Sequence, residues 1–160
     1  MRSIADEAGV DVALISYFFG SKRGLFGATM ALEANPALVL ADALPGDLNT
    51  LPERILRALI TTWDDPLRSL PMRVMIAGAV ADPGVARLLR EVIEAEMIAR
   101  IADRLGGPDA TARAAVAAVQ AFGLIFDRYL LRVEPLASMP ADELVARMAP
   151  AMRAALSPHR

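Results

Sequence analysis

Residues 1–26 read MRSIADEAGVDVALISYFFGSKRGLF, and this segment predicts two short helices, a tight turn between them and the start of a third helix. The first helix covers 4–8 and ends at Gly9, because glycine adopts left-handed turn angles that other residues resist. Asp11 then caps a second helix over 12–19. This layout is typical of a helix-turn-helix, in which the second helix enters the major groove of DNA.

The rest of the chain also reads as helices separated by glycine and proline. Thr50 and Glu53 have the spacing of a capping box, which predicts a helix start at 50. Pro71 is expected in the first turn of a helix that begins at 70, where proline is tolerated. The expected helices beyond the first two cover 22–34, 38–44, 50–63, 70–81, 83–105, 109–133 and 140–156. Because no strand pattern occurs in the sequence, the prediction is an all-α fold, with a helix-turn-helix head over 1–34 and a larger helical body over 35–160.

The composition predicts a helical, cytoplasmic protein. Hydrophobic residues make up 55% of the 160 residues, and aromatic residues only 5%. The mean hydropathy of +0.39 predicts more apolar surface than one subunit buries, which favours a dimer. The longest apolar run, 114–126, is shorter than the roughly 18 residues that span a bilayer, so no membrane partner is expected. The first residues lack a signal-peptide pattern, and the absence of cysteine excludes disulfides and thiolate metal sites.

The charge pattern gives the N-terminal segment no general attraction to DNA. The chain carries a formal net charge of −2. Within residues 1–30 the cations and anions balance, with Arg2, Lys22 and Arg23 against Asp6, Glu7 and Asp11. DNA-binding heads usually carry an excess of positive charge. The helix-turn-helix prediction therefore depends on the helical pattern alone.

The sequence offers little for catalysis. The single histidine, His159, is the penultimate residue, and no glycine-rich phosphate loop occurs. Pairs of acidic residues fall at expected helix ends or on solvated faces, where no catalytic role is needed to explain them. We therefore expect no enzyme, no catalytic residue, no metal site and no cofactor.

The N-terminal segment resembles the TetR family of transcriptional regulators. The match covers residues 1–30 and is carried in register by Ile4-Ala5, Ala8-Gly9-Val10, Ile15, Phe19, Ser21-Lys22 and Leu25-Phe26. The rest of the chain matches only as a helical body of suitable length. Two positions depart from the family pattern, since Ser16 stands where tyrosine is more frequent and Phe18 where histidine is.

The resemblance implies a homodimeric repressor that leaves its double-stranded DNA operator when a small hydrophobic ligand binds. By position, Asp11, Val12, Ala13 and Leu14 would face base edges, and Ser3, Ser16, Tyr17 and Lys22 would meet phosphates. Val12, Ala13 and Leu14 can offer only methyl contacts or shape fit to the bases. Sequence specificity is therefore expected to be modest, or to come from residues outside this chain.

Heads of this family resemble three-helix bundles, and the present sequence begins at the second of the three helices. The apolar side chains of 4–25 would then lack one wall of their core, and each such side chain is worth about 1.5–3 kcal/mol when buried. The expectation is a chain shortened at its N-terminus, with an incomplete head and weak operator binding. An alternative function follows from this expectation, namely a DNA-silent helical protein that dimerises or binds a ligand.

The helices between 53 and 133 supply a candidate ligand pocket. Methionine side chains adapt to the shape of a ligand and suit a permissive apolar cavity. The candidates are Trp63, Met72, Met75, Ile76, Met97, Phe122 and Phe126, with Thr61, Thr62, Arg73 and Gln120 as polar candidates. Ordinary core packing is the alternative interpretation for each of them. A bound ligand is expected to be hydrophobic with few polar groups.

The last two helices predict the dimer interface. Small residues leave the helix over 109–133 almost without bulk, namely Ala114, Ala115, Ala117, Ala118, Ala121 and Gly123. Small side chains allow close helix approach, and a helix that is apolar on nearly every side must be covered on nearly every side. We expect 109–133 and 140–156 to pair with their copies as a four-helix interface. A central core helix is the alternative.

Overall fold

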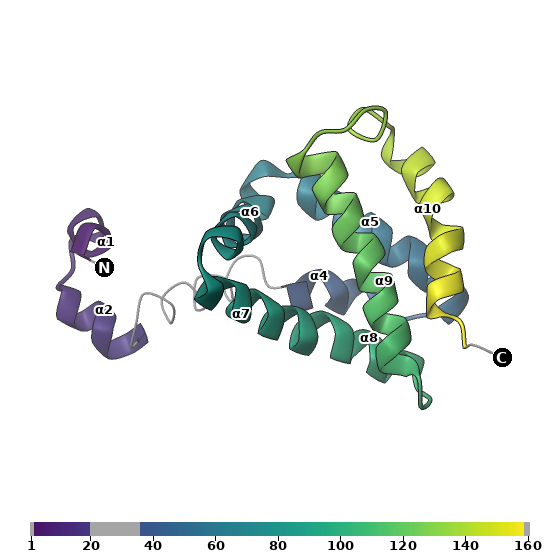
Figure 1. Ribbon diagram of the computed structural model, residues 1–160, viewed down its shortest axis with the longest axis horizontal. Helices are drawn as coiled ribbons and strands as arrows, with labels where there is room; N and C mark the ends of the chain where they lie inside the picture. The colour runs from purple at the N-terminus through teal and green to yellow at the C-terminus, as the bar shows by residue number, and fades with distance from the viewer. Residues whose placement is uncertain (1, 20–35, 159–160) are drawn as a thin grey trace.

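The computed structural model describes residues 2–19 and 36–158, and every regular element in these two ranges is helical (Figure 1). The all-α prediction is therefore confirmed for these ranges. The predicted helix over 22–34 lies outside the described residues. The elements are α1 (Arg2–Ala8), α2 (Val12–Phe19), α4 (Pro36–Ala43), the 3₁₀ turn η1 (Leu48–Thr50), α5 (Leu51–Asp64), α6 (Pro66–Ala81), α7 (Pro83–Val92), η2 (Ile93–Ile98), α8 (Ala99–Leu105), α9 (Ala110–Leu124), η3 (Ile125–Leu130) and α10 (Ala141–Leu156).

The body packs around the apolar face of α5. Seven residues of this helix are buried at helical spacing, Leu51, Pro52, Ile55, Leu56, Leu59, Ile60 and Trp63. Helix α10 packs along α5 and α9, and α8 packs on α9. The alanines Ala114, Ala117, Ala118 and Ala121 of α9 are buried within the subunit. Their small side chains permit this close approach, so part of α9 serves as a core helix.

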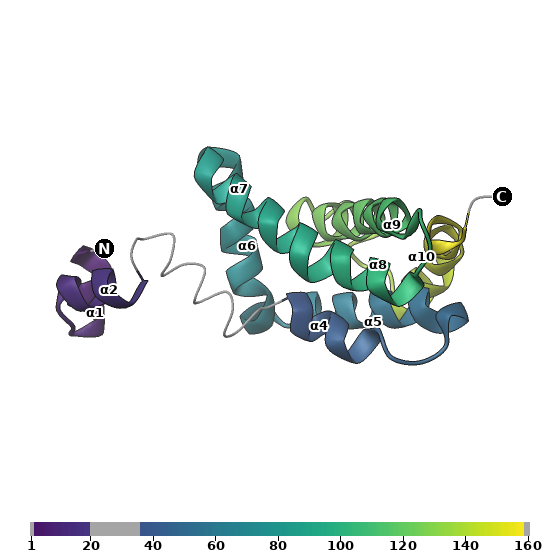
Figure 2. The same cartoon turned by 90° about the horizontal axis from the view of Figure 1, so that it is seen from below.

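Two wide turns interrupt the long helices. The backbone N–H of Ala99 donates to Glu94 O in η2, and that of Leu131 donates to Phe126 O at 2.8 Å in η3. These bonds join residues five apart, as in a π-helix, instead of four apart. Helices α7 and α8 nevertheless form one continuous rod through η2 (Figure 2).

The start of α5 differs from the predicted capping box. Asp47 caps the preceding turn, because its Oδ1 accepts from the backbone N–H of Asn49 at 2.9 Å. Thr50 adopts φ −102° and ψ 2°, and its hydroxyl donates to Asp47 O at 3.2 Å. Glu53 pairs with Arg153 of α10 instead of reaching back to residue 50. The capping-box prediction was wrong because a 3₁₀ turn precedes α5 and removes the extended backbone that the motif requires.

Helix α6 begins four residues earlier than predicted, at Pro66. The Oδ1 of Asp65 accepts from the backbone N–H groups of Leu67 at 2.9 Å and Arg68 at 3.2 Å. Proline at the first helical position is favoured because its missing N–H has no partner there in any case. Pro71 consequently lies inside the helix, not in its first turn. The helix therefore starts at the Asp65 cap even though this start places Pro71 inside it.

Arg113 joins three helix ends at the base of the body. Its side chain is 6% exposed, and its Nε donates to Asp109 Oδ1 at 2.9 Å. Its Nη1 donates to Leu156 O at 2.7 Å, and its Nη2 donates to Gly106 O at 2.5 Å. One guanidinium therefore fixes the end of α8, the start of α9 and the end of α10.

The segment Ala110–Leu130, formed by α9 and η3, is 21 residues long with a hydropathy of 1.2, and by length and composition alone it could cross a membrane. Core helices of soluble proteins meet the same criteria. In this structure the alanines of α9 described above are buried against other helices of the same subunit.

Candidate ligand cavity and nucleic-acid-binding head

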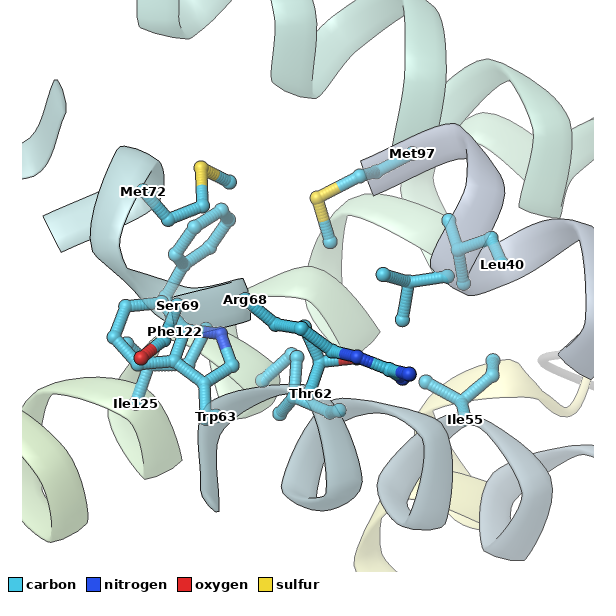
Figure 3. Close-up of a pocket in the computed structure, with 13 residues that line it drawn as sticks. Leu40, Ile55, Thr62, Trp63, Arg68, Ser69, Met72, Met97, Phe122 and Ile125 are labelled. Carbon is cyan, nitrogen blue, oxygen red and sulfur yellow. The ribbon is translucent and has the colours of Figure 1, made fainter. Parts of the chain in front are cut away.

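An apolar cavity lies between α4, α5, α6, η2 and the α9–η3 helix (Figure 3). Its lining consists of Val39, Leu40, Ile55, Leu59, Thr62, Trp63, Arg68, Ser69, Met72, Met97, Ala121, Phe122 and Ile125. Of the seven predicted apolar pocket residues, four are in this set, namely Trp63, Met72, Met97 and Phe122, and the predicted polar candidate Thr62 is there as well. The other three lie outside the lining: Met75 is buried in the core, Ile76 packs against the core, and Phe126 is half exposed.

The cavity is small as it stands. The space open to the centre of a water-sized sphere is about 50 Å³. That volume holds a few water molecules, whereas pockets for drug-sized ligands span roughly 300–1,000 Å³. Met72 and Met97 lie on opposite sides of the space, and Arg68 extends across it (Figure 3). Both methionines have several rotatable bonds, so these side chains give the cavity room to enlarge.

The polar groups of the lining are largely engaged with the protein itself. Thr62 Oγ1 donates to Ala58 O of its own helix at 2.8 Å. Ser69 is fully buried, and its Oγ accepts from Arg73 Nε at 3.1 Å. Arg68 is mostly exposed and lies 3.4 Å from Asp65 Oδ2. An apolar ligand suits such a lining best, because few polar groups are available to it.

The remaining polar candidates lie elsewhere. Thr61 is exposed. The Nε2 of Gln120 donates to Ala151 O of α10 at 3.2 Å. Arg73 lies behind the cavity wall, with its guanidinium carbon 5.1 Å from the centroid of the Trp63 ring.

Several lining residues were not foreseen from the sequence. Val39 and Leu40 come from α4, which the sequence identifies as a short helix without indicating what it packs against. Ile55 and Leu59 belong to the apolar stripe of α5, and only the fold separates the cavity-lining members of a stripe from the rest.

Aromatic and charged side chains form the wall behind Trp63. The Tyr129 ring lies 5.6 Å from the Trp63 ring between centroids. The Tyr129 hydroxyl donates to Asp64 Oδ1 at 2.8 Å. Burial, followed by the hydrogen bond to the Asp64 carboxylate, raises the pKa of Tyr129 to about 12. The phenol is therefore a neutral hydrogen-bond donor at physiological pH.

The head shows the predicted helical hairpin. Gly9 has φ 65°, and the N–H of Val10 donates to Ala5 O at 3.0 Å, so the chain turns directly after α1. Asp11 Oδ1 accepts from the N–H of Ala13 at 2.8 Å and caps α2 as expected. Helix α2 has the predicted bounds, Val12–Phe19. Helix α1 starts at Arg2, two residues before the predicted start at 4, so Ser3 lies within the helix.

Five of the eight predicted DNA-facing residues belong to α2, Asp11 directly precedes this helix, and Ser3 belongs to α1. Asp11, Ala13 and Leu14 are exposed and Val12 is half buried at the N-terminal end of the helix. Tyr17 is 82% exposed one turn further on. Ser16 belongs to the same helix, and Lys22 lies outside the described residues. The N-terminal end of α2 is thus open to a partner.

Comparisons with known proteins agree with this architecture. Residues 1–29 match the family model described as bacterial regulatory proteins of the tetR family, and residues 49–156 match the tetracyclin repressor-like C-terminal domain. The structure is similar to that of a TetR-family regulator from Streptomyces coelicolor A3, with 30% sequence identity and a TM-score of 0.70. This similarity covers 98% of the present chain and 82% of the other. A search of curated proteins gave no significant match. The two family models and the shared fold together show that the chain belongs to the TetR family of bacterial transcriptional regulators.

Proposed function

We propose that this regulator is a cytoplasmic repressor whose binding to operator DNA is relieved when a small hydrophobic ligand enters the cavity. The head over 1–34 binds DNA, and the body over 35–160 binds ligand and dimerises. The observation that carries the proposal is an almost wholly apolar cavity in which α4, the first helix of the body, supplies part of the wall. The match of residues 1–29 to the family's regulatory-protein model favours this function over a DNA-silent dimerising protein.

The anchoring of α4 suggests how the cavity acts on the head. Arg54 Nε donates to Ala43 O at 2.8 Å, and Arg104 Nε donates to Leu44 O at 3.1 Å. These bonds hold the C-terminal end of α4 on α5 and α8. Leu40 lies on the cavity side of the same helix. A ligand that displaces Leu40 would therefore tilt α4 about its anchored end and shift the N-terminal end of this helix.

The head is expected to contact DNA through the residues that the family resemblance assigns by position. The N-terminal end of α2 presents Asp11, Val12, Ala13 and Leu14 to base edges, and Ser3, Ser16, Tyr17 and Lys22 contact phosphates. Exposure of Asp11, Ala13 and Leu14 at this end supports it. Their short or apolar side chains favour thymine methyl contacts and shape over bidentate hydrogen bonds.

The proposed dimer forms through α9 and α10, within 109–133 and 140–156. Val116, Val119 and Phe126 are exposed along α9 and η3. At Gly123 an added Cβ would meet no other described atom within 4 Å. On α10, Ala151 and Ala154 are exposed beside them, and both line the groove between α9 and α10 with Val116. Small and apolar residues on two adjacent helices are what a four-helix interface requires.

The test combines operator selection with ligand release. The full chain is first used to enrich binding sites from a random duplex pool, and the enriched site is labelled for fluorescence anisotropy. Hydrophobic compounds are then screened by the emission of Trp63, the single tryptophan of the chain, which lines the cavity. A compound that changes this emission is expected to lower the DNA affinity as well.

A matched pair of variants assigns the effect to the cavity. Ala121→Val adds bulk to the lining, whereas Ala99→Val makes the same change on the exposed face of α8. We expect A121V to bind DNA normally but to respond at least tenfold less to the compound, and A99V to behave as wild type. Failure to enrich any DNA sequence, or equal ligand responses of the two variants, would refute the proposal.

A further inference from the structure

A polar depression lies behind the aromatic wall of the apolar cavity. It is lined by Asp64, Arg73, Arg128, Tyr129, Arg132 and Ala137, and about 270 Å³ is open to the centre of a water-sized sphere. We call this feature the arginine depression. Three guanidinium groups face one carboxylate there, so the depression carries an excess of positive charge.

One oxygen of the Asp64 carboxylate is already engaged. Asp64 Oδ1 accepts from the Tyr129 hydroxyl at 2.8 Å, and it lies 3.9 Å from Arg128 Nη2. At most one of the three cations is neutralised by it. The other two leave the depression attractive to an anion.

Arg128 is fixed in place but retains an unused donor. Its side chain is 10% exposed, and its Nη1 donates to Leu136 O at 2.5 Å and Met139 O at 2.7 Å. Its Nε is buried and has no hydrogen-bond partner within the described chain. Buried donors without a partner are rare in folded proteins and call for an explanation. Because Arg128 lines the depression, an anion bound there would lie beside this incompletely satisfied guanidinium.

Arg73 and Arg132 supply the remaining donors. Arg73 uses its Nε for Ser69 and its Nη1 for Tyr129 O at 3.0 Å, which holds the guanidinium plane in position. Arg132 makes no side-chain hydrogen bond or ion pair with any described residue. Its backbone has φ 56°, a left-handed angle that is uncommon for residues other than glycine and that clusters at functional sites.

We propose that the arginine depression binds the carboxylate or phosphate group of a small anionic metabolite. Guanidinium forks match the planar or tetrahedral oxygens of these groups and bind them with two parallel hydrogen bonds. The proposal goes beyond ligand release through the apolar cavity, because it concerns a second site with the opposite chemical preference. It does not depend on the operator.

The side chains around Trp63 separate the apolar cavity from the arginine depression, so Trp63 emission can report binding in the depression. The guanidinium of Arg73 stacks 5.1 Å from the Trp63 ring centroid, and Trp63 is the single tryptophan of the chain. An anion that binds the Arg73 guanidinium would change the environment of the Trp63 ring.

The test is a titration of the full chain with inorganic phosphate and, separately, with succinate, followed by Trp63 emission and by the melting temperature. Ionic strength is held constant with chloride, which removes general salt effects. Saturable binding of phosphate, succinate or both supports the proposal, and their relative affinities distinguish a phosphate site from a carboxylate site.

Three variants make the test specific. Arg132→Gln is expected to weaken anion binding about tenfold, since it removes a charged donor that holds no structural contact. Arg87→Gln on exposed α7 makes the same charge change away from the depression and should leave binding unchanged. Asp64→Asn removes the repelling carboxylate and should tighten binding about threefold. No saturable signal with either anion, or equal titrations of R132Q and R87Q, would overturn the proposal.

Discussion

Replacing Arg113 by methionine is expected to destabilise the body by about 3 kcal/mol. The substitution keeps much of the aliphatic stem but removes three hydrogen bonds from a charged donor. Asp109 is partly exposed, so water can replace the guanidinium there. The carbonyl of Leu156 is bonded in a buried position and would be left unsatisfied, which costs about 1–3 kcal/mol on its own. The rest comes from the bonds to Asp109 and Gly106.

Arg147 provides a matched control. It pairs with Glu143 four residues earlier, and the distance from its Nε to Glu143 Oε1 is 2.9 Å, equal to that in the Arg113 pair. Its side chain is 66% exposed, against 6% for Arg113. An exposed pair of this kind contributes about 0.5 kcal/mol. The two variants therefore separate the effect of burial from the effect of pair geometry.

The assay is urea unfolding followed by circular dichroism, with all proteins at one concentration because dimerisation links stability to concentration. We expect the midpoint of R113M to fall with an unchanged slope, and its melting temperature to drop by about 6–12 °C. R147M should stay within about 2 °C of wild type. A free energy of unfolding for R113M within about 1 kcal/mol of that for R147M would refute the reasoning.

Three further predictions concern other parts of the body. Tyr129→Phe should lose about 1–2 kcal/mol, because the phenol no longer donates to Asp64. The phenol ionises near pH 10 in the unfolded chain and at about 12 in the folded one, so its stabilisation is complete below pH 10 and is lost toward pH 12. The wild type should thus approach Y129F in urea midpoint over that window, and a constant difference would contradict this. Asp65→Ala should cost about 1 kcal/mol through loss of the α6 cap, seen as a lower melting temperature. Val119→Glu, at a 70% exposed position of α9, should convert the proposed dimer to a monomer in sedimentation velocity, whereas Val80→Glu, at an 88% exposed position of α6, should not. A dimeric V119E would place the interface elsewhere.

Local signals predict some helix boundaries correctly, although the Asp65 cap that starts α6 was missed. Gly9 and Asp11 predict the turn and the cap before α2 correctly, because both act within a few residues. Asp82 likewise accepts from the N–H of Gly84 at 2.6 Å and starts α7 where expected. The capping box predicted at Thr50 does not form, because Asp47 caps a 3₁₀ turn that includes Thr50. Competing local signals cannot be ranked without the packing that surrounds them.

The cavity could be predicted only in part. Phe122 and Phe126 stand four residues apart, which places them on one face of a regular α-helix. In the structure Ile125 lines the cavity with Phe122, whereas Phe126 is half exposed. Residues three and four positions after Phe122 both lie near its face, so only the neighbouring helices decide which of the two is covered. The side chains of α4 were missed for another reason, since a contact between distant segments leaves no periodic trace in the sequence.

The wide turns η2 and η3 also affect how the chain tolerates changes in length. A bond between residues five apart encloses one residue more than an α-helical bond. Deleting a single residue within 93–98 would therefore leave an uninterrupted α-helix and would keep Arg104 on the side that reaches α4. A deletion elsewhere in the same rod would rotate everything beyond it by about 100°. Single-residue length variation can thus be absorbed in the middle of a helix, a place where most proteins do not accept it.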